Sequence, residues 1–201
     1  MADLDCDVSG AASLWFSGDY SWLCQPTDYS AQPQALQALS LSWWFYTSKF
    51  IDFFDSIFFL LRGKMSHLSL LHVLHHSTLP AFSWFGPKFA GGGNTTFGGM
   101  WNSLVHVIMY SYYFLAAAGP GFQKYLWWKK YLTSMQMVQF VVVFVHCLVP
   151  LIHPSCGYSL GVNLVIMFNG CLYWFLFLAF YRENYSRQST KLDVNGNRKD
   201  K

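Results

Sequence analysis

Long hydrophobic segments alternate with short polar connections along most of this chain. Five of these segments are near the ~20 residues that a helix needs to cross a bilayer. The segment around Pro80 is the shortest, and its proline predicts a helix that is broken or only partly spanning. The pattern therefore predicts an all-α fold, a multi-pass membrane helix bundle of about five spans. The spans run approximately over Ser40–Leu61, Leu68–Phe85, Phe97–Ala118, Tyr131–Pro150 and Val162–Tyr181.

The composition agrees with a membrane protein. Hydrophobic residues make up 53% of the chain and charged residues only 11%, against about 25% charged residues in soluble domains. The net charge of +3 is too small to indicate nucleic-acid binding, and the five cysteines have no CxxC spacing, so no zinc site is predicted. Residues 1–39 carry no basic region and no apolar core, so no cleavable signal peptide is expected.

Lysine and arginine lie almost entirely in alternate connections. They follow the first, third and fifth segments, whereas the other connections carry only Lys88. The positive-inside rule then places the N-terminus in the lumen and the C-terminus in the cytosol. We expect a lumenal segment over residues 1–39, a membrane domain over 40–181 and a cytosolic basic tail over 182–201. The basic residues nearest the membrane on the cytosolic side are Arg62, Lys64, Lys124, Lys129, Lys130 and Arg182.

This orientation puts two cysteines on the lumenal side. Cys24 and Cys156 could form a disulfide there, because the lumen is oxidising; two free thiols are the alternative. At the other end, Arg198-Lys199-Asp200-Lys201 resembles a dilysine signal for retrieval to the endoplasmic reticulum, with Arg198 where a lysine is usual. A solvated charged tail is an equally good interpretation of these residues.

Three histidines in the second segment carry the strongest chemical signal. His72, His75 and His76 fall within an arc of about 100° on one helix face. Ionisable groups are costly in hydrocarbon and usually face a protein interior or a wet cavity. The cluster therefore indicates a site that acts on a molecule reached from the bilayer.

Other segments carry polar side chains at helical spacing. Lys49, Asp52 and Ser56 share one face of the first segment, where Lys49 and Asp52 can partly neutralise each other. The predicted orientation brings these groups and the histidines into one layer, roughly 8–18 Å below the cytosolic surface at about 1.5 Å per residue. Helix–helix hydrogen bonding is the structural alternative, above all for His106 and the glutamines. The other polar residues of this layer are Asp55, Asn102, Tyr110, Gln136 and Gln139.

These residues form motifs that resemble those of the very-long-chain fatty acid elongases of the ELO family. The resemblance covers about residues 15–186. The sequence HVLHH at residues 72–76 matches the family's histidine box, HxxHH. Residues 102–113, NSLVHVIMYSYY, match NxxxHxxMYxYY, and residues 133–139, TSMQMVQ, match TxxQxxQ.

The chain departs from the family pattern in several places. KFIDFFDS at residues 49–56 is similar to KxxExxDT, with Asp52 for glutamate and Ser56 for threonine. The shorter Asp52 carboxylate would loosen a positioned ion pair. Ala179 stands where an asparagine is expected. The family fold has seven helices with a six-helix barrel, so five spans resemble an elongase without its first two helices, and one wall of the barrel would be missing.

The resemblance implies the condensation that opens each elongation cycle. A long-chain acyl-CoA and malonyl-CoA give 3-oxoacyl-CoA, CoA and carbon dioxide. Neutral imidazole is nucleophilic near pH 7, and an acyl-imidazole can pass its acyl group on. We expect His75 to hold the acyl group, and His72 and His76 to position or tune it.

The remaining polar groups receive roles in the same hypothesis. His106, with Asn102 and Tyr110, would donate hydrogen bonds to developing oxyanions. The cytosolic basic residues, with Gln136 and Gln139, would bind the coenzyme A part of the substrates. The groups that would hold the histidine box and offset its charge are Lys49, Asp52 and Asp55.

The implied surroundings follow from the same family. No bound cofactor or metal is expected, because acyl-CoA and malonyl-CoA are substrates. The protein would lie in the endoplasmic reticulum membrane and bind lipid substrates, with the acyl chain among Phe, Trp and Leu in the lumenal half. Homo- or hetero-oligomers with elongases and other enzymes of the cycle are implied, and nucleic acid is not.

Two other interpretations compete with a condensing enzyme. A membrane di-iron desaturase or hydroxylase also uses HxxHH, but it needs further histidine boxes, and this chain has one box among seven histidines. A non-catalytic elongase-like protein that binds lipid or a full-length elongase is the second alternative. The changes at Asp52, Ser56 and Ala179 favour that alternative, whereas the intact motifs favour the enzyme.

Overall fold

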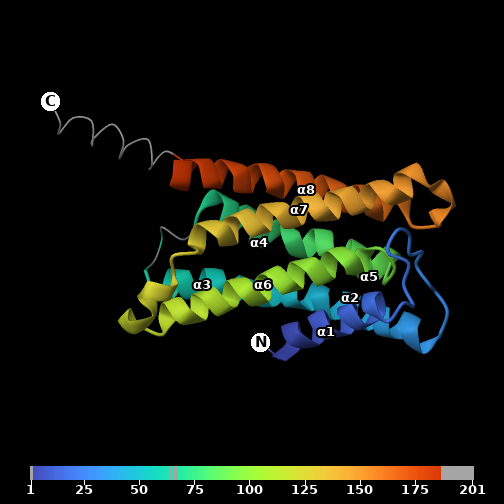
Figure 1. The fold of residues 1–201 in the computed structure, drawn as a ribbon, viewed down its shortest axis with the longest axis horizontal. Helices are drawn as coiled ribbons and strands as arrows, with labels where there is room; N and C mark the ends of the chain where they lie inside the picture. The colour runs from blue at the N-terminus through green and yellow to red at the C-terminus, as the bar shows by residue number, and fades with distance from the viewer. Residues whose placement is uncertain (1, 64, 66–67, 187–201) are drawn as a thin grey trace.

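The computed structural model describes residues 2–63, 65 and 68–186, and this part of the chain is almost entirely helical, with no strand. The long helices run nearly parallel to the longest axis of the molecule (Figure 1). Three short helical turns, η2 (Pro120–Tyr125), η3 (Pro154–Cys156) and η4 (Arg182–Ser186), lie at their ends. The helices are α1 (Ala2–Phe16), α2 (Pro33–Ile51), α3 (Phe53–Leu61), α4 (Leu70–Ser83), α5 (Phe85–Phe89), α6 (Thr95–Ala117), α7 (Lys129–Ile152) and α8 (Leu160–Tyr181).

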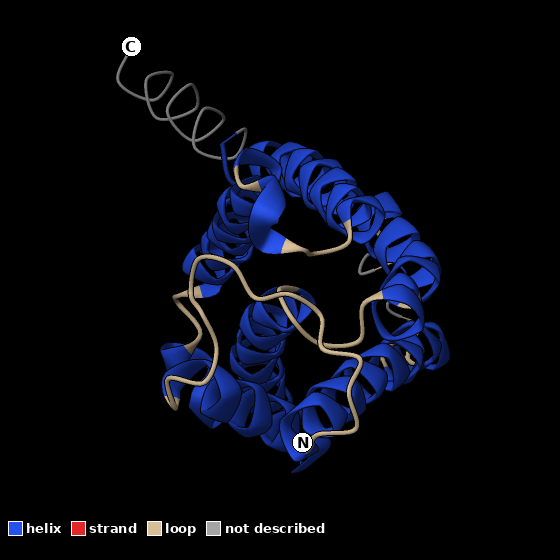
Figure 2. Cartoon of the chain, turned by 90° about the vertical axis from the view of Figure 1, so that its right-hand side faces the viewer, coloured by secondary structure: helices blue, strands red, loops and turns tan. Residues whose placement is uncertain are grey.

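Contacts between the helices close a ring. Helix α1 packs on α6, α6 on α7, α7 on α8, α8 on α4, α4 on α2, and α2 again on α1. Viewed along the helices, they lie grouped around a common axis, and loops cross one end of the group (Figure 2). The wall expected to be missing is therefore occupied in part by α1.

Two of the predicted spans are each built from two helices placed end to end. The first becomes α2 and α3, which meet at Asp52; this residue keeps nearly helical angles, φ −58° and ψ −20°, so the two helices stay in line (Figure 1). The second becomes α4 and α5. Pro80 lies buried inside α4, and the helix breaks at Trp84 instead of at the proline.

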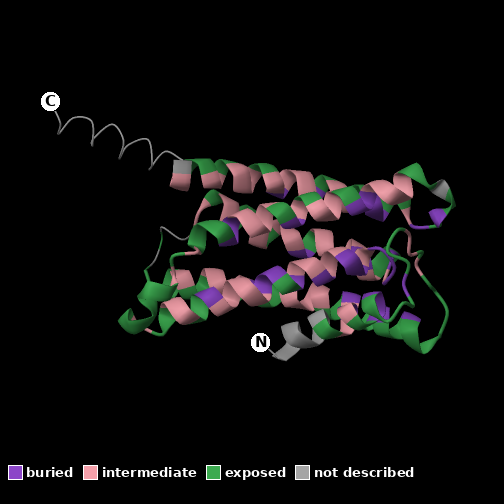
Figure 3. Cartoon of the chain, in the orientation of Figure 1, coloured by how far each residue is buried: buried purple, intermediate pink, exposed green. Residues whose placement is uncertain are grey.

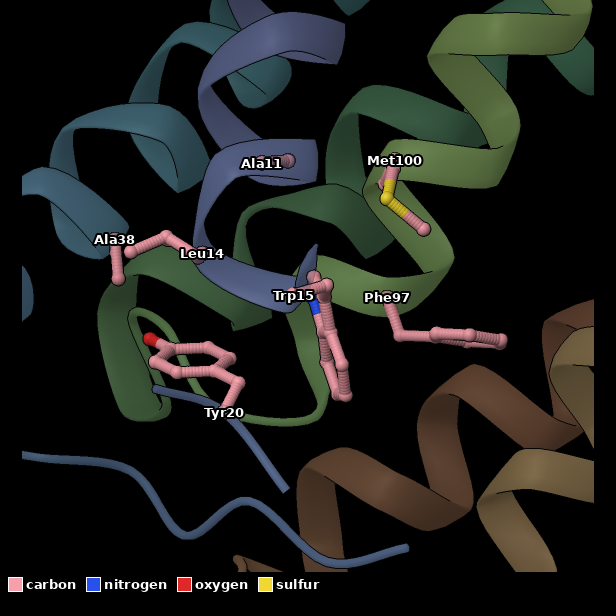
Figure 4. Packing of buried hydrophobic residues seen from close by; sticks show 7 residues of the cluster. All are labelled: Ala11, Leu14, Trp15, Tyr20, Ala38, Phe97 and Met100. Carbon is pink, nitrogen blue, oxygen red and sulfur yellow. The ribbon is translucent and has the colours of Figure 1, made fainter. Parts of the chain in front are cut away.

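Helix α1 was not anticipated from the sequence, which predicted no apolar core in residues 1–39. The indole of Trp15 is fully buried, and its Nε1 donates to Thr96 Oγ1 at 3.0 Å. This places the end of α1 against the start of α6. A single turn of small and aromatic side chains forms the contact, too short to register as a hydrophobic segment. Figure 4 shows the cluster, which consists of Ala11, Leu14, Trp15, Tyr20, Ala38, Phe97 and Met100.

Among the described residues, two helices are long and apolar enough to cross a membrane. They are α7, with a mean hydropathy of 2.1, and α8, extended to Tyr185, with 1.9. The other three predicted spans stay predictions. Exposed residues occur along the helices from one end to the other (Figure 3), and many are large and apolar, such as Trp43, Trp44, Phe168 and Phe175. Exposed apolar surface of this extent is typical of a face that contacts lipid.

The two ends of the bundle differ in chemistry. We call one the basic end, because the exposed residues Arg62, Lys124, Lys129, Lys130 and Arg182 lie on the connections there. The opposite end, which we call the disulfide end, holds a bridge between Cys24 and Cys156 with a Cα–Cα distance of 5.6 Å. Lys64 and the tail over 187–201, with its retrieval-like sequence, lie outside the described residues.

The disulfide end is closed by close backbone contacts. The Gln25 amide donates to Asn94 Oδ1 at 2.8 Å, and the Asn94 amide donates to the Gln25 carbonyl at 3.0 Å. Gly93 has φ +60°, and a Cβ there would lie 2.8 Å from the Gln25 oxygen, so only glycine fits. Beside them Tyr158 and Thr95 hydroxyls are hydrogen-bonded, and burial raises the pKa of Tyr158. The loop from α1 to α2 is thus fastened to the rest of the bundle.

Loss of the disulfide should destabilise the protein measurably. The bridge joins residues 132 positions apart, and closing so long a loop in the unfolded chain is worth about 2–4 kcal/mol. We expect Cys24→Ser to lower the unfolding free energy of the detergent-solubilised protein by that amount. Cys171→Ser, which removes a free half-buried thiol, is the control. Equal stability of Cys24→Ser and wild type would contradict the prediction.

Candidate functional site

A buried ion pair lies at the centre of the polar layer. Lys49 on α2 is only 1% exposed, and its Nζ contacts Asp52 Oδ2 at 3.3 Å. The same Nζ donates to Asn102 Oδ1 of α6 at 3.0 Å and lies 4.6 Å from the centre of the Phe45 ring. A buried ammonium ion must be compensated in this way, because the desolvation penalty is several kcal/mol per ion. The pair therefore fixes α2 against α6.

Tyr110 joins this ion pair to a second carboxylate. Its hydroxyl lies 3.0 Å from Asp52 Oδ1 and 2.8 Å from Asp55 Oδ2. The hydroxyl has one proton, which the two carboxylates share. The junction of α2 and α3 is held against α6 by this contact, and Tyr110 has no second proton for another acceptor.

The histidine box lies on α4, opposite α3. The helix begins at a capping residue, Ser69, whose Oγ accepts the His72 amide at 3.2 Å. The Ser56 hydroxyl lies 2.9 Å from His72 Nε2, which connects α3 to the box. His72 and His76 are one turn apart, and their ring centres lie 4.1 Å from each other. Both residues are thereby placed beside His75, whose ring centre is 5.3 Å from that of His76.

His75 is held by ring contacts with α8. Its ring centre lies 4.9 Å from that of Tyr173 and 6.4 Å from that of Phe177. The Tyr173 hydroxyl is hydrogen-bonded to Thr78 Oγ1 of α4 at 2.8 Å. Thr78 Oγ1 in turn donates to the Leu74 carbonyl at 2.6 Å. Within the described residues, no hydrogen bond reaches the imidazole of His75. Its ring is positioned while its nitrogens stay available.

The contribution of α8 was missed by sequence reasoning. Helix α8 has almost no polar residues near its basic end, so the search for polar side chains passed over it. The only available signal was the i, i+4 spacing of Tyr173 and Phe177 on one face. That spacing is common in ordinary packing and would not have identified the contact with His75.

The hydrogen bonds of His106 disagree with its expected role. His106 is buried, and its Nδ1 lies 2.8 Å from the Asn102 carbonyl oxygen. Because a carbonyl can only accept, Nδ1 carries the proton, and Nε2 of the neutral ring is an acceptor. Neutral His106 therefore cannot donate to an oxyanion from Nε2. The Tyr110 proton is also used, so of the three expected donors only the Asn102 Nδ2 group remains, since its Oδ1 accepts from Lys49.

An apolar cavity of about 160 Å³ begins beside this layer. It extends from Asn102 and Tyr173 to Thr95 and Pro87 near the disulfide end. Phenylalanines and leucines line it as expected, but no tryptophan does among the described residues; glycines on α6 and α8 take part instead. The lining includes Leu41, Phe45, Leu79, Phe82, Phe85, Gly98, Gly99, Phe140, Val143, Ile166 and Gly170.

The other predicted residues lie in two places. Gln139 on α7 is buried and lines the cavity, whereas Gln136 donates to Met109 Sδ at 3.4 Å. The described basic residues lie exposed at the basic end, outside the polar layer. Among the described residues, no group of three histidine, cysteine or acidic side chains is arranged to hold a metal.

The fold and the site define a helical membrane-type protein with a histidine cluster beside an apolar cavity. The family model for ELO, described as the GNS1/SUR4 family, matches residues 7–193. The chain belongs to this family.

Several relatives are named very long chain fatty acid elongases. One from Aedes aegypti is 49% identical over 86% of this chain and 48% of its own length. Elongase 7 of Drosophila melanogaster is 45% identical over 88% of this chain and 54% of its own length. Elongase 7 of Rattus norvegicus is 48% identical over 94% of this chain and 68% of its own length. The chain thus spans about half the length of the two insect relatives.

Removing the central cation should be costly for stability. In Lys49→Met, the Asp52 carboxylate stays buried without its counter-ion, which costs about 3–5 kcal/mol. We expect that loss in the unfolding free energy, and partial recovery in Lys49→Met/Asp52→Asn. Lys88→Met is the control, because Lys88 is exposed and lies 5.9 Å from the centre of the Trp84 ring. A Lys49→Met protein as stable as wild type would show that the ion pair is not needed.

Proposed function

We propose that this protein acts in the condensation step of very-long-chain fatty acid elongation. The reaction joins an acyl-CoA to malonyl-CoA and gives 3-oxoacyl-CoA, CoA and carbon dioxide. The observation that carries the proposal is His75: an imidazole without hydrogen-bond partners in the described part of the chain, held by Tyr173 beside an apolar cavity. Membership of the ELO family supports the same assignment.

The first half-reaction is acyl transfer to His75. A neutral imidazole nitrogen attacks the thioester carbonyl, the C–S bond breaks, and coenzyme A leaves as thiolate. The proton lost by the imidazole passes to an acceptor, and His106 Nε2 is the suitable group, because its Nδ1 proton is donated to Asn102. His106 thus acts as a proton acceptor in this proposal, in place of the expected donor.

The second half-reaction forms the carbon–carbon bond. Malonyl-CoA loses carbon dioxide, and the resulting enolate attacks the acyl carbonyl on His75. The C–N bond breaks and the product is 3-oxoacyl-CoA. The departing His75 imidazolate takes back the proton held on His106 Nε2, so both histidines return to the neutral form. The Asn102 Nδ2 group is the donor that could stabilise the oxyanion of each tetrahedral intermediate. Lys49 supports this role by holding the Asn102 carboxamide oxygen.

The two ends of the bundle suit the two ends of the substrate. The phosphates of coenzyme A would bind at the basic end, and the acyl chain would occupy the apolar cavity toward the disulfide end. This orientation puts the basic end in the cytosol and the disulfide in the lumen of the endoplasmic reticulum. Other elongases and enzymes of the same cycle are the partners we propose.

Replacement of His75 tests the proposal directly. We expect His75→Ala to lose condensation of labelled malonyl-CoA with acyl-CoA by at least a hundredfold, since the nucleophile is absent. The assay uses the full chain in microsomes without endogenous elongases. His153→Ala is the matched control, because His153 is exposed near the disulfide end. Near-normal condensation rates in His75→Ala would contradict the covalent route. A wild-type protein that inserts stably but is inactive would favour a non-catalytic lipid-binding role.

The length of the product should depend on the glycines of α6. Gly99 lines the cavity, and a Cβ there would be in ordinary contact with the Phe45 ring at 3.7 Å. The two methyl groups of Gly99→Val would then occupy part of the cavity in which we place the acyl chain. We therefore expect products with shorter acyl chains. Gly161→Val is the control, since no atom lies within 4 Å of a Cβ at Gly161. Product lengths are read by mass spectrometry, and an unchanged distribution would place the acyl chain elsewhere.

A further inference from the structure

Besides Ser42 and Thr96, whose hydroxyls donate to backbone carbonyls, three buried polar side chains interrupt the apolar lining of the cavity. Ser103 on α6 is 2% exposed, Gln139 on α7 is 6% exposed and Asn169 on α8 is 9% exposed. All three line the cavity, and each comes from a different helix. We call this set the polar belt. An acyl chain without polar groups cannot form hydrogen bonds with these side chains.

The polar belt lies about one helical turn from the histidines, toward the disulfide end. Asn169 precedes Tyr173 by four residues, and Tyr173 contacts His75. Ser103 precedes His106 by three residues on α6. One turn of helix rises about 5.4 Å, so an acyl chain held at His75 passes the belt a few carbons from its carbonyl.

Asn169 has an unused hydrogen-bond acceptor. Its Nδ2 donates to the Val165 carbonyl at 2.8 Å, which sets the orientation of the carboxamide. The Oδ1 atom is buried and, within the described residues, has no hydrogen-bond partner. A buried acceptor without a partner costs about 1–3 kcal/mol. The residue itself lines the cavity, so a chain bound there passes beside this side chain.

A residue without a side chain follows Asn169 on the cavity wall. The next residue is Gly170, which also lines the cavity, and the nearest atom to a Cβ there would be the Phe140 carbonyl oxygen at 4.0 Å. Asn163 also has a buried Oδ1 without a partner, but it does not line the cavity. The two asparagines on α8 therefore differ in their access to a ligand.

We propose that Asn169 makes this site selective for acyl chains that carry a hydroxyl group a few carbons from the thioester. The inference rests on the proposed function and adds the substrate class. An acceptor needs a donor, which a ketone, an alkene or a methylene cannot supply and a hydroxyl can. A protonated amine would bring a charge into the apolar cavity at high cost. The hydroxyl donates to Asn169 Oδ1, and Ser103 and Gln139 can satisfy its oxygen.

The test compares substrates in wild type and Asn169→Leu. Purified full chain in lipid nanodiscs receives labelled malonyl-CoA and either a saturated acyl-CoA or one of its monohydroxy positional isomers. We expect one group of isomers, hydroxylated near the thioester, to have a kcat/KM relative to the saturated substrate that falls about tenfold or more in Asn169→Leu, as for a buried hydrogen bond. Because each rate is divided by that of the saturated substrate in the same protein, any effect of Asn169→Leu that both substrates share cancels.

Thermal stability and a matched variant show whether the effect of Asn169→Leu is specific. Asn169→Leu should melt at about the same temperature, because it removes a buried oxygen without a partner together with the hydrogen bond from Nδ2 to the Val165 carbonyl. Asn169→Ala serves if the leucine variant does not fold. Asn163→Leu should leave the substrate ratio unchanged. The inference is overturned if, for every hydroxylated isomer, the kcat/KM relative to the saturated substrate is the same in wild type and in Asn169→Leu.

The same proteins separate this inference from the proposed function. Turnover of the saturated substrate supports the proposed function whatever the hydroxylated substrates do. If no substrate reacts, the proposed function fails, and thermal stabilisation by the hydroxyacyl-CoA isomers decides the inference. A larger stabilisation in wild type than in Asn169→Leu upholds selectivity for the hydroxyl, and an equal one refutes it.

Discussion

The burial of Lys49 is the constraint on which the rest of the site depends. An ammonium group at 1% exposure is tolerated only when its charge and its donors are matched. Asp52 and Asn102 provide that match, and they lie on different helices. Tyr110 extends the contact to Asp55. The position of α6 relative to α2 and α3 is therefore set by a polar requirement, within a bundle that is otherwise apolar.

The same set of bonds determines which groups are left for chemistry. Asn102 accepts from Lys49 with its side chain and from His106 with its backbone carbonyl. This leaves the Nδ2 donor of Asn102 and the lone pair of His106 Nε2 facing the interior. His75 receives ring contacts in place of hydrogen bonds. Under the proposed function, an imidazole restrained by ring contacts, with no hydrogen bond from the described residues, suits transfer of an acyl group.

The apolar half of the molecule is built by different means. The cavity remains open because glycines on α6 and α8 lack side chains where the helices approach each other. At the far end, the bundle is closed by the disulfide and by two hydrogen bonds between Gln25 and Asn94, one to the Asn94 side chain and one between backbone groups. The polar side chains thus lie at one depth and the apolar cavity below them. Under the proposed function, separate parts of the molecule would recognise the reacting carbonyl and the end of the acyl chain.

The local pattern of the sequence was sufficient to locate the five hydrophobic segments, though not α1 or the breaks at Asp52 and Trp84, and to identify polar side chains that share a helix face. Hydrophobic periodicity and loop charge are properties of neighbouring residues, so the pairing of Lys49 with Asp52 and the common face of His72, His75 and His76 could be predicted. Tertiary structure alone decided that α1 joins the ring, that Tyr173 holds His75, which proton His106 carries, and that Asn169 faces the cavity. Each of these depends on distances between helices remote in sequence, and such distances are set only when the helices pack.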